Sequence, residues 1–265
     1  MSLRTLGASW RAMLAVAEMT FRQQVMDAFV LFTILVQPLL IAMLGLWMLR
    51  DKGSQVAIFV VVGSGMTGLW SGLLFICGNS INIERWFGTL ETLVGVPTPL
   101  EVIVFGKNLA NVLQSLISMI AGYLLAAWLF GYPLRIDQPL LFFPSMLLMV
   151  VAFISFGLII APIFVMNPSV QHWQNGLEFP VYILSGFLFP IALLPGWTTP
   201  MSYLLHTYWA ARALHGTSSG GASVDEVLFS WAMLLVFSAI YLFIAGKLFK
   251  KMLVKASADA TLDME

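Results

Sequence analysis

Side chains that commonly carry chemistry are few in this sequence and stand far apart. His172, His206 and His215 lack the spacing of a metal-ligand set, and we interpret them as polar residues at helix interfaces. The single cysteine, Cys77, lies in an apolar run and cannot form a disulfide within the chain. Few carboxylates stand outside loops, so no Ser/His/Asp arrangement can be argued. The sequence therefore predicts neither a catalytic centre nor a metal site.

One carboxylate, Glu178, falls inside an otherwise uncharged stretch. It is the sole acidic residue within a predicted membrane span, and an ionisable residue at membrane depth suggests a function by default. Its position is about two helical turns from the cytoplasmic end of that span. Two interpretations stay open: a role in transport, or a carboxylate that snorkels or pairs with a residue such as Arg85.

The elements that hold these residues are apolar. Of 265 residues, 60% are apolar and 10% charged, with a mean hydropathy of +0.91, whereas soluble domains carry about 25% charged residues. This composition excludes an ordinary water-soluble globule. The formal net charge of zero gives no reason to expect a nucleic-acid partner.

Uncharged runs long enough to cross about 30 Å of hydrocarbon predict six spans. We place them at residues 28–49, 56–80, 108–131, 139–166, 171–189 and 227–249. Asn167-Pro168-Ser169 separates the fourth from the fifth. We expect helices, because an open sheet edge would leave backbone groups unpaired in lipid. The predicted fold is an all-α integral membrane protein, with residues 1–265 forming a single transmembrane domain in a lipid bilayer.

Basic residues indicate how the spans are oriented. With the N-terminus inside, nine lysines and arginines lie on the inner side and four on the outer side, as the positive-inside bias requires. Both termini are then predicted to be cytoplasmic. Residues 1–27 form a predicted amphipathic helix, which either lies in the inner membrane interface or packs, solvated, on another part of the protein.

The segment between the second and third spans carries the most informative pattern. Residues 84–94 predict a short helix with a stop at Gly95. Thr98-Pro99-Leu100-Glu101 fits a capping box that opens the next helix. A short helix held between two spans at the membrane face would transmit a push to both.

Two blocks resemble the type-2 ABC transporter permeases, the membrane subunits of exporters for drugs, lipids and polysaccharides. The first is Glu84-Arg85-x-x-Gly88-Thr89-Leu90-Glu91, followed by the proline turn 97–99 and Gly106-Lys107. The second is residues 184–190, then Leu194-Pro195-Gly196-Trp197 and a helix over 200–214. Both stand in the family's order, so the resemblance covers almost the whole chain.

The resemblance implies a permease of the bacterial cytoplasmic membrane that exports a drug- or lipid-like amphiphile. Export of a polysaccharide or glycolipid, or a non-transport scaffold, are the alternatives. In this family two separate ATPase subunits bind ATP and Mg²⁺, and two permeases, identical or paralogous, form the pathway. The N-terminal helix would dock the ATPase together with the coupling residues Glu84, Arg85, Trp86, Gly88, Thr89, Leu90 and Glu91. The alternative for Glu84, Arg85 and Glu91 is a solvated loop with weak exposed pairs.

The chain lacks the loop that would hold ATP itself. A P-loop needs Gly-x-x-x-x-Gly-Lys-Ser/Thr, because its amides and lysine bind the phosphates. Gly106-Lys107 is followed by Asn108 and has Glu101 at the first glycine position, and Gly246-Lys247 is followed by Leu248. We therefore expect no enzyme activity and no cofactor in this chain.

The stretch 190–216 is too proline-rich to continue the fifth span and too apolar for an ordinary loop. We predict a re-entrant hairpin that turns at Pro195-Gly196 near the outer leaflet, with a helix over 200–214 in the interface. Such backbone is tolerated at membrane depth only where protein or a water-lined cavity satisfies it. We expect it to gate the outer mouth through Gly186, Phe189, Pro190, Pro195, Gly196 and Trp197. Ser223-Val224-Asp225-Glu226 predicts a capping box at the start of the last span.

Small residues repeat along the second predicted span. Gly63, Gly65, Gly68 and Gly72 recur at intervals of two, three and four residues, and small residues let helix backbones approach closely in lipid. Packing within the chain and a seam between two permeases are both compatible with this face.

Overall fold

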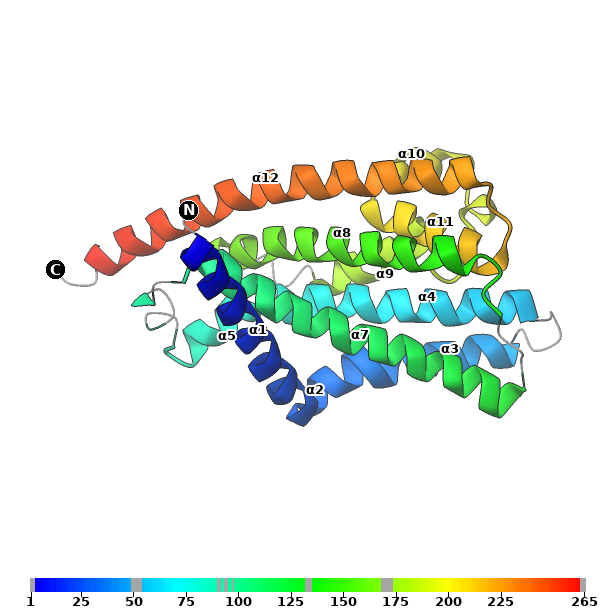
Figure 1. Ribbon diagram of the computed structural model, residues 1–265, viewed down its shortest axis with the longest axis horizontal. Coiled ribbons are helices and arrows are strands. Elements are labelled where there is room, and N and C mark those ends of the chain that lie inside the picture. Colours follow the sequence, from blue (N-terminus) through cyan, green and yellow to red (C-terminus); the bar gives the residue numbers. More distant parts are fainter. Residues whose placement is uncertain are drawn as a thin grey trace.

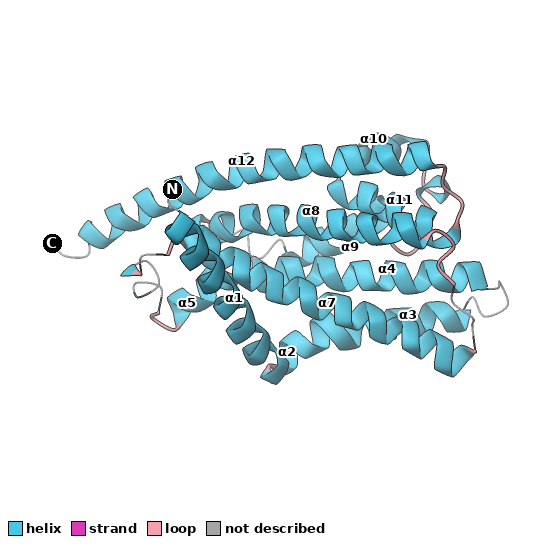
Figure 2. Cartoon of the chain, in the orientation of Figure 1, coloured by secondary structure: helices cyan, strands magenta, loops and turns pink. Residues whose placement is uncertain are grey.

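The computed structural model is a bundle of long helices (Figures 1 and 2). It describes residues 3–48, 54–89, 92, 95–96, 98–131, 135–167 and 174–262. Every regular element within these ranges is helical. The all-helical fold predicted from the sequence is therefore confirmed for the described part of the chain.

Five helical segments of the described chain are long and apolar enough to cross a membrane. They are Ala28–Met48, Val56–Trp86, Leu100–Phe130, Pro139–Met166 and Val224–Val254. The first is built from α2 (Ala28–Leu31), the π-helical turn η1 (Phe32–Val36) and α3 (Gln37–Met48). The second joins α4 (Ser54–Gly72), the π-helical turn η3 (Leu73–Cys77) and α5 (Ser80–Trp86). The others lie in α7 (Leu100–Phe130), α8 (Pro139–Met166) and α12 (Val224–Leu262).

The span predicted at 171–189 is not a full-length helix in the structure. Its helix, α9, covers Gln174–Ser185; these 12 residues extend about 18 Å, against about 30 Å of hydrocarbon. Gly186 ends the helix with a left-handed φ of +71°. Phe187 N–H donates to the Tyr182 carbonyl and Gly186 N–H to that of Ile183, each at 3.2 Å, which is a Schellman turn. Residues 168–173, including most of the predicted break and His172, lie outside the described residues.

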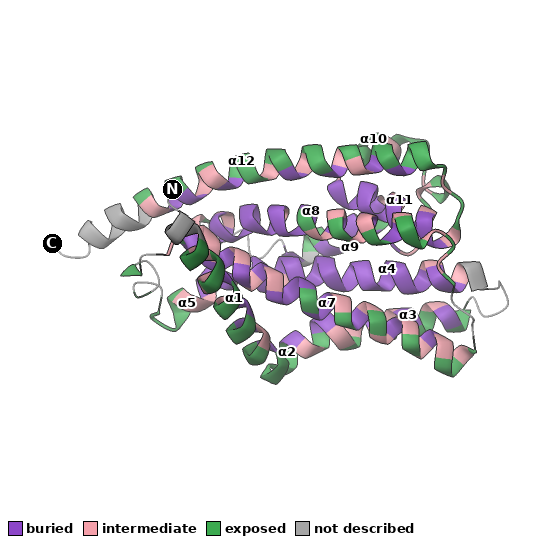
Figure 3. Ribbon diagram, in the orientation of Figure 1, coloured by how far each residue is buried: buried purple, intermediate pink, exposed green. Residues whose placement is uncertain are grey.

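α4 is the central helix of the bundle, and Figure 3 shows it mostly buried from residue 56 onward. Its glycines let neighbours approach. A Cβ on Gly65 would lie 2.5 Å from Met119 of α7, and one on Gly68 would lie 2.6 Å from Pro38 of α3. Of the two roles left open for these glycines, the structure shows packing within the chain.

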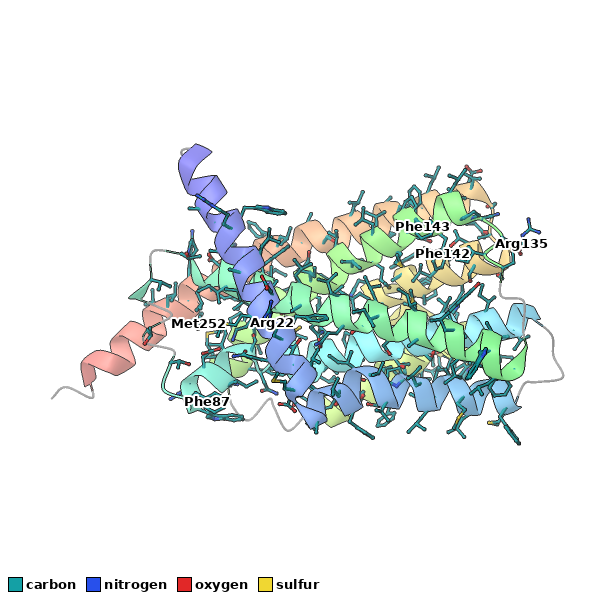
Figure 4. The ribbon with its side chains drawn as sticks, turned by 60° about the horizontal axis from the view of Figure 1, so that its bottom comes forward. Arg22, Phe87, Arg135, Phe142, Phe143 and Met252 are labelled. Carbon is teal, nitrogen blue, oxygen red and sulfur yellow. The ribbon has the colours of Figure 1, made fainter. Side chains whose placement is uncertain are left out.

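The N-terminal helix, α1 (Leu3–Met26), packs obliquely across α7 (Figures 1 and 4). Met13 and Ala17 are buried, and a Cβ on Gly106 of α7 would lie 2.7 Å from the Met13 carbonyl oxygen. Gln114 of α7 donates to the Phe21 carbonyl at 3.3 Å. The structure thus shows packing on the same chain, while a position in the membrane interface stays a prediction.

The stretch after α9 folds back into the bundle. Two 3-10 turns, Ile191–Leu193 and Gly196–Thr198, lead to α10 (Thr199–Tyr203) and α11 (His206–Ser219). This differs from the helix predicted over 200–214, because the chain breaks at Leu204 and Leu205 and α11 is largely buried against α4, α8 and α12. Apart from Leu214 and two aromatics, the buried side chains of α11 are small or polar, so the apolar pattern suggested a helix at the membrane interface.

Two predicted capping boxes have different outcomes. Ser223 Oγ accepts from Glu226 N–H at 3.3 Å, and Glu226 accepts from Ser223 N–H at 3.1 Å, so the box that opens α12 is confirmed. α7 instead begins at Leu100 with Pro99 as its N-cap, and no side chain caps it. The box predicted at Thr98 is therefore wrong.

The two ends of the bundle differ. α1 begins and α12 ends at the end where α5 lies (Figure 1). Arg135 lies at the opposite end from Phe87 (Figure 4). Residues predicted to be cytoplasmic thus gather at one end of the bundle and a residue predicted to be external at the other.

Candidate functional site: an exposed turn and a buried carboxylate

The predicted coupling segment begins as the end of α5. Gly88, with φ +69°, and Thr89 close a Schellman turn after Trp86. Thr89 N–H donates to the Glu84 carbonyl at 2.9 Å, and Gly88 N–H donates to that of Arg85 at 3.1 Å. α5 therefore starts before residue 84 and stops at Gly88, whereas the sequence predicted one helix over 84–94 with a stop at Gly95. Beyond the turn, Thr92 and Gly95 are again helical. Leu90 and Glu91 lie outside the described residues.

Glu84 connects this turn to α7. Lys107 forms an ion pair with one Glu84 carboxylate oxygen and also donates to the Ser80 carbonyl at 3.1 Å. The Thr89 hydroxyl donates to the other carboxylate oxygen. The Glu84 side chain is only 22% exposed and that of Lys107 15%, so solvent screens the pair less than a surface pair. Glu84 is therefore part of a structured contact rather than a solvated loop.

Two large aromatic residues project from the same turn. Trp86 is 72% exposed and Phe87 78%, and Arg85 beside them is also exposed. Figure 4 shows Phe87 at the end of the bundle where α12 ends. Exposed aromatic patches commonly mark interaction surfaces. We call Arg85, Trp86 and Phe87 the exposed turn.

The carboxylate of Glu178 is buried among neutral hydrogen-bond donors. Glu178 is 5% exposed, and one of its oxygens accepts from the hydroxyls of Ser71 and Tyr182, both at 2.6 Å, and from the Gln37 amide at 3.4 Å. Among the described residues, no lysine or arginine forms an ion pair with it, and Arg85 is exposed. Sequence reasoning found Glu178 and missed its three partners. The spacing of Tyr182 four residues later was the available signal.

Two of these partners each lie next to a π-helical turn. Gln37 directly follows η1, and Ser71 precedes η3 by two residues. Such turns are rare and frequent at functional sites. At η3, the Leu74 carbonyl accepts from the Gln174 amide of α9 at 3.0 Å. The backbone irregularities of two spans therefore meet the polar side chains of α9.

The two described histidines are buried in separate places. His206 lies 6.3 Å from Trp70 between ring centroids and contacts the Tyr241 hydroxyl at 3.2 Å. His215 stacks on Phe59 at 3.7 Å and contacts the Phe187 carbonyl at 3.1 Å. Within the described ranges, no three His, Cys, Asp or Glu side chains gather as a metal site would require.

The residues predicted to gate the outer mouth lie along the turn that follows α9. Gly186 ends α9, and a Cβ there would lie 2.9 Å from Ile191. Phe189 is partly buried, while Pro190, Pro195, Gly196 and Trp197 are exposed. The structure places them in sequence on one connection to α10, and their gating role stays a prediction.

These features define a polytopic helical membrane protein with a structured turn at one end and a buried carboxyl group inside the bundle. A family model described as ABC-2 type transporter matches residues 11–217, most of the chain from α1 to α11. The chain therefore belongs to the ABC-2 type transporter family, whose membrane domain is a permease rather than a catalytic domain. No curated protein matches the chain at a significant level.

Proposed function

We propose that this chain is the permease subunit of an ATP-driven exporter that moves a drug- or lipid-like amphiphile outward. Two separate ATPase subunits would bind ATP and Mg²⁺ and dock on the exposed turn and on α1. A second permease, identical or paralogous, would complete the pathway in the bacterial inner membrane. The observation that carries this proposal is the exposed turn, because its aromatic residues face away from a bundle to which Glu84 and Lys107 fasten it.

The exposed turn is well placed to transmit motion. α5 follows α4 through η3, and α4 packs against α3, α7 and α11. The Glu84–Lys107 ion pair adds a second connection, to α7. A push on Trp86 and Phe87 would therefore reach the centre of the bundle by two routes.

Contacts of α11 support the re-entrant geometry. His206, at its start, lies beside Trp70, whereas His215 lies beside Phe59, near the start of α4. Trp70 follows Phe59 by eleven positions, about 16 Å along α4. We infer that the chain runs from the outer side into the bundle between α9 and α11, and that α11 returns to the outer side. α9 then takes part in a sixth crossing, and both termini are cytoplasmic.

The test is transport by the permease reconstituted with its ATPase. We expect the double variant Trp86→Ala/Phe87→Ala to insert normally, to copurify with at least tenfold less ATPase and to lose transport. Trp128→Ala is the matched control, because Trp128 is 89% exposed near the far end of α7 and should change neither readout. Normal ATPase recovery and transport by the double variant would overturn the proposal.

A further inference from the structure

The distribution of side chains on α9 is the reverse of that expected for a helix in a soluble protein. Its buried face carries Gln174, Glu178, Val181, Tyr182 and Ser185, whereas Leu177, Phe179, Pro180 and Ile183 are exposed. The polar side chains thus point into the bundle and the apolar ones away from it. In lipid this arrangement is the expected one for a helix that borders a polar path.

Each polar side chain of this buried face meets a polar group of a neighbouring element. Gln174 donates to the Leu74 carbonyl at 3.0 Å, and Tyr182 lies 3.3 Å from the Thr67 carbonyl. Glu178 accepts from Ser71, and Ser185 shares a hydrogen bond with Thr207 of α11. We call the contact of α9 with α4 and η3 the polar seam. Hydrogen-bonding groups that pair with each other here can also pair with a polar ligand.

Among the residues that the structure describes, no cationic side chain pairs with Glu178. Its hydrogen-bond partners, Ser71, Tyr182 and Gln37, are all neutral. In the sequence, no lysine or arginine stands between Lys52 and Arg85, or between Arg135 and Arg212, the stretches that contain α4 and α9. A buried carboxylate without a cation is costly in a medium of low dielectric constant, so a cationic group arriving beside it is favoured.

We propose that Glu178 binds the cationic group of an amphipathic substrate in the polar seam. This inference rests on the proposed function, because that function makes the bound molecule a transported substrate. The ring of Tyr182 lies beside the carboxylate and 5.9 Å from that of Phe179 between centroids, so a cation at the carboxylate would lie next to aromatic rings. Phe179 is 59% exposed, so its ring offers the apolar body a contact on the lipid side. The permease then selects amphiphilic cations over neutral and anionic amphiphiles.

The test is binding of rhodamine 6G, a permanently cationic amphiphile, to the full chain in nanodiscs, measured by fluorescence polarisation. We expect Glu178→Gln to weaken binding at least tenfold. Dodecylamine should displace the dye from the wild-type protein far better than dodecanol does. Unchanged affinity in Glu178→Gln, or equal displacement by dodecanol, would overturn the proposal.

The matched control is Glu18→Gln on α1, which also removes one carboxylate. The Glu18 side chain is 66% exposed and pairs with Arg22, so this variant should bind the dye as the wild type does. An equal loss of binding there would show a general effect of charge and overturn the assignment to Glu178. Displacement of the dye by millimolar sodium or potassium would assign the carboxylate to an inorganic cation instead, and would equally overturn it.

A second measurement needs no variant and remains decisive if Glu178→Gln fails to fold. Dicyclohexylcarbodiimide modifies carboxyl groups in apolar surroundings, and mass spectrometry locates the adduct. We expect saturating rhodamine 6G to protect Glu178 of the wild-type protein. The same extent of modification with and without the dye would contradict the proposal.

These binding measurements contain no ATPase, so the two proposals fail separately. Binding that depends on Glu178 in a protein that shows no ATP-driven transport would overturn the proposed function alone. ATP-driven transport with binding that ignores Glu178 would overturn the inference alone.

Discussion

Of the glycines of α4, Gly63 is the one at which an added Cβ would come closest to another segment. A Cβ at this position would lie 1.8 Å from the Phe187 carbonyl oxygen. Because the obstacle is backbone, a side chain cannot swing aside to make room. We expect Gly63→Ala to destabilise the protein by about 1–3 kcal/mol, as overpacking of a core does, seen as a lower apparent Tm in detergent.

Gly246→Ala is the control for that measurement. Gly246 lies inside α12, and no atom lies within 4 Å of the place that an alanine methyl group would occupy. The alanine should therefore gain up to about 1 kcal/mol from helix propensity. An apparent Tm for Gly63→Ala equal to that of Gly246→Ala would contradict the packing described for α4.

For individual residues, the sequence identified some functional candidates and not their partners. Glu178 stood out because a carboxylate in an apolar run is rare. Ser71 and Gln37 did not, because their meeting with Glu178 depends on how three segments pack. The Glu84–Lys107 pair joins residues 23 positions apart, and only the fold brings such residues together.

The turn that ends α5 depends on one glycine conformation. Gly88 has φ +69°, and a non-glycine residue there is disfavoured by about 1 kcal/mol or more. We expect Gly88→Ala to shift the end of the helix, redirect Trp86 and Phe87, and lower the amount of substrate transported per ATP hydrolysed. Gly95→Ala should leave that ratio unchanged, because Gly95 has neither a left-handed φ nor a neighbour within 4 Å. An unaltered ratio in both variants would argue against the role of the turn.

Among elements, the long helices were predictable because the thickness of a bilayer sets their length. α8 begins at Pro139 and ends at Met166, the bounds expected from the apolar run and the following Asn-Pro. The Schellman turns at Gly88 and Gly186 were not predicted; at the first, Gly95 competed as the stop signal. The burial of α11 was missed for a different reason: a helix shielded by three others has no single apolar face.

For the whole molecule, the distribution of basic residues predicts that the end with α5 is cytoplasmic. Thr98→Cys and Arg135→Cys test this in a Cys77→Ser background; the native Cys77 is buried. A membrane-impermeant maleimide should label position 135 in intact cells and position 98 only after the cells are opened. Labelling of position 98 in intact cells would contradict this orientation.

The central claim is that an ABC ATPase docks on the exposed turn. The most direct measurement places a photo-crosslinking amino acid at Phe87, after α5. The control position is Trp128, near the C-terminal end of α7. We expect irradiated cells to yield a crosslinked product from position 87 whose peptides include a P-loop ATPase, and no such product from position 128. A crosslink from position 87 to lipid alone, or equal ATPase crosslinking from both positions, would contradict the claim.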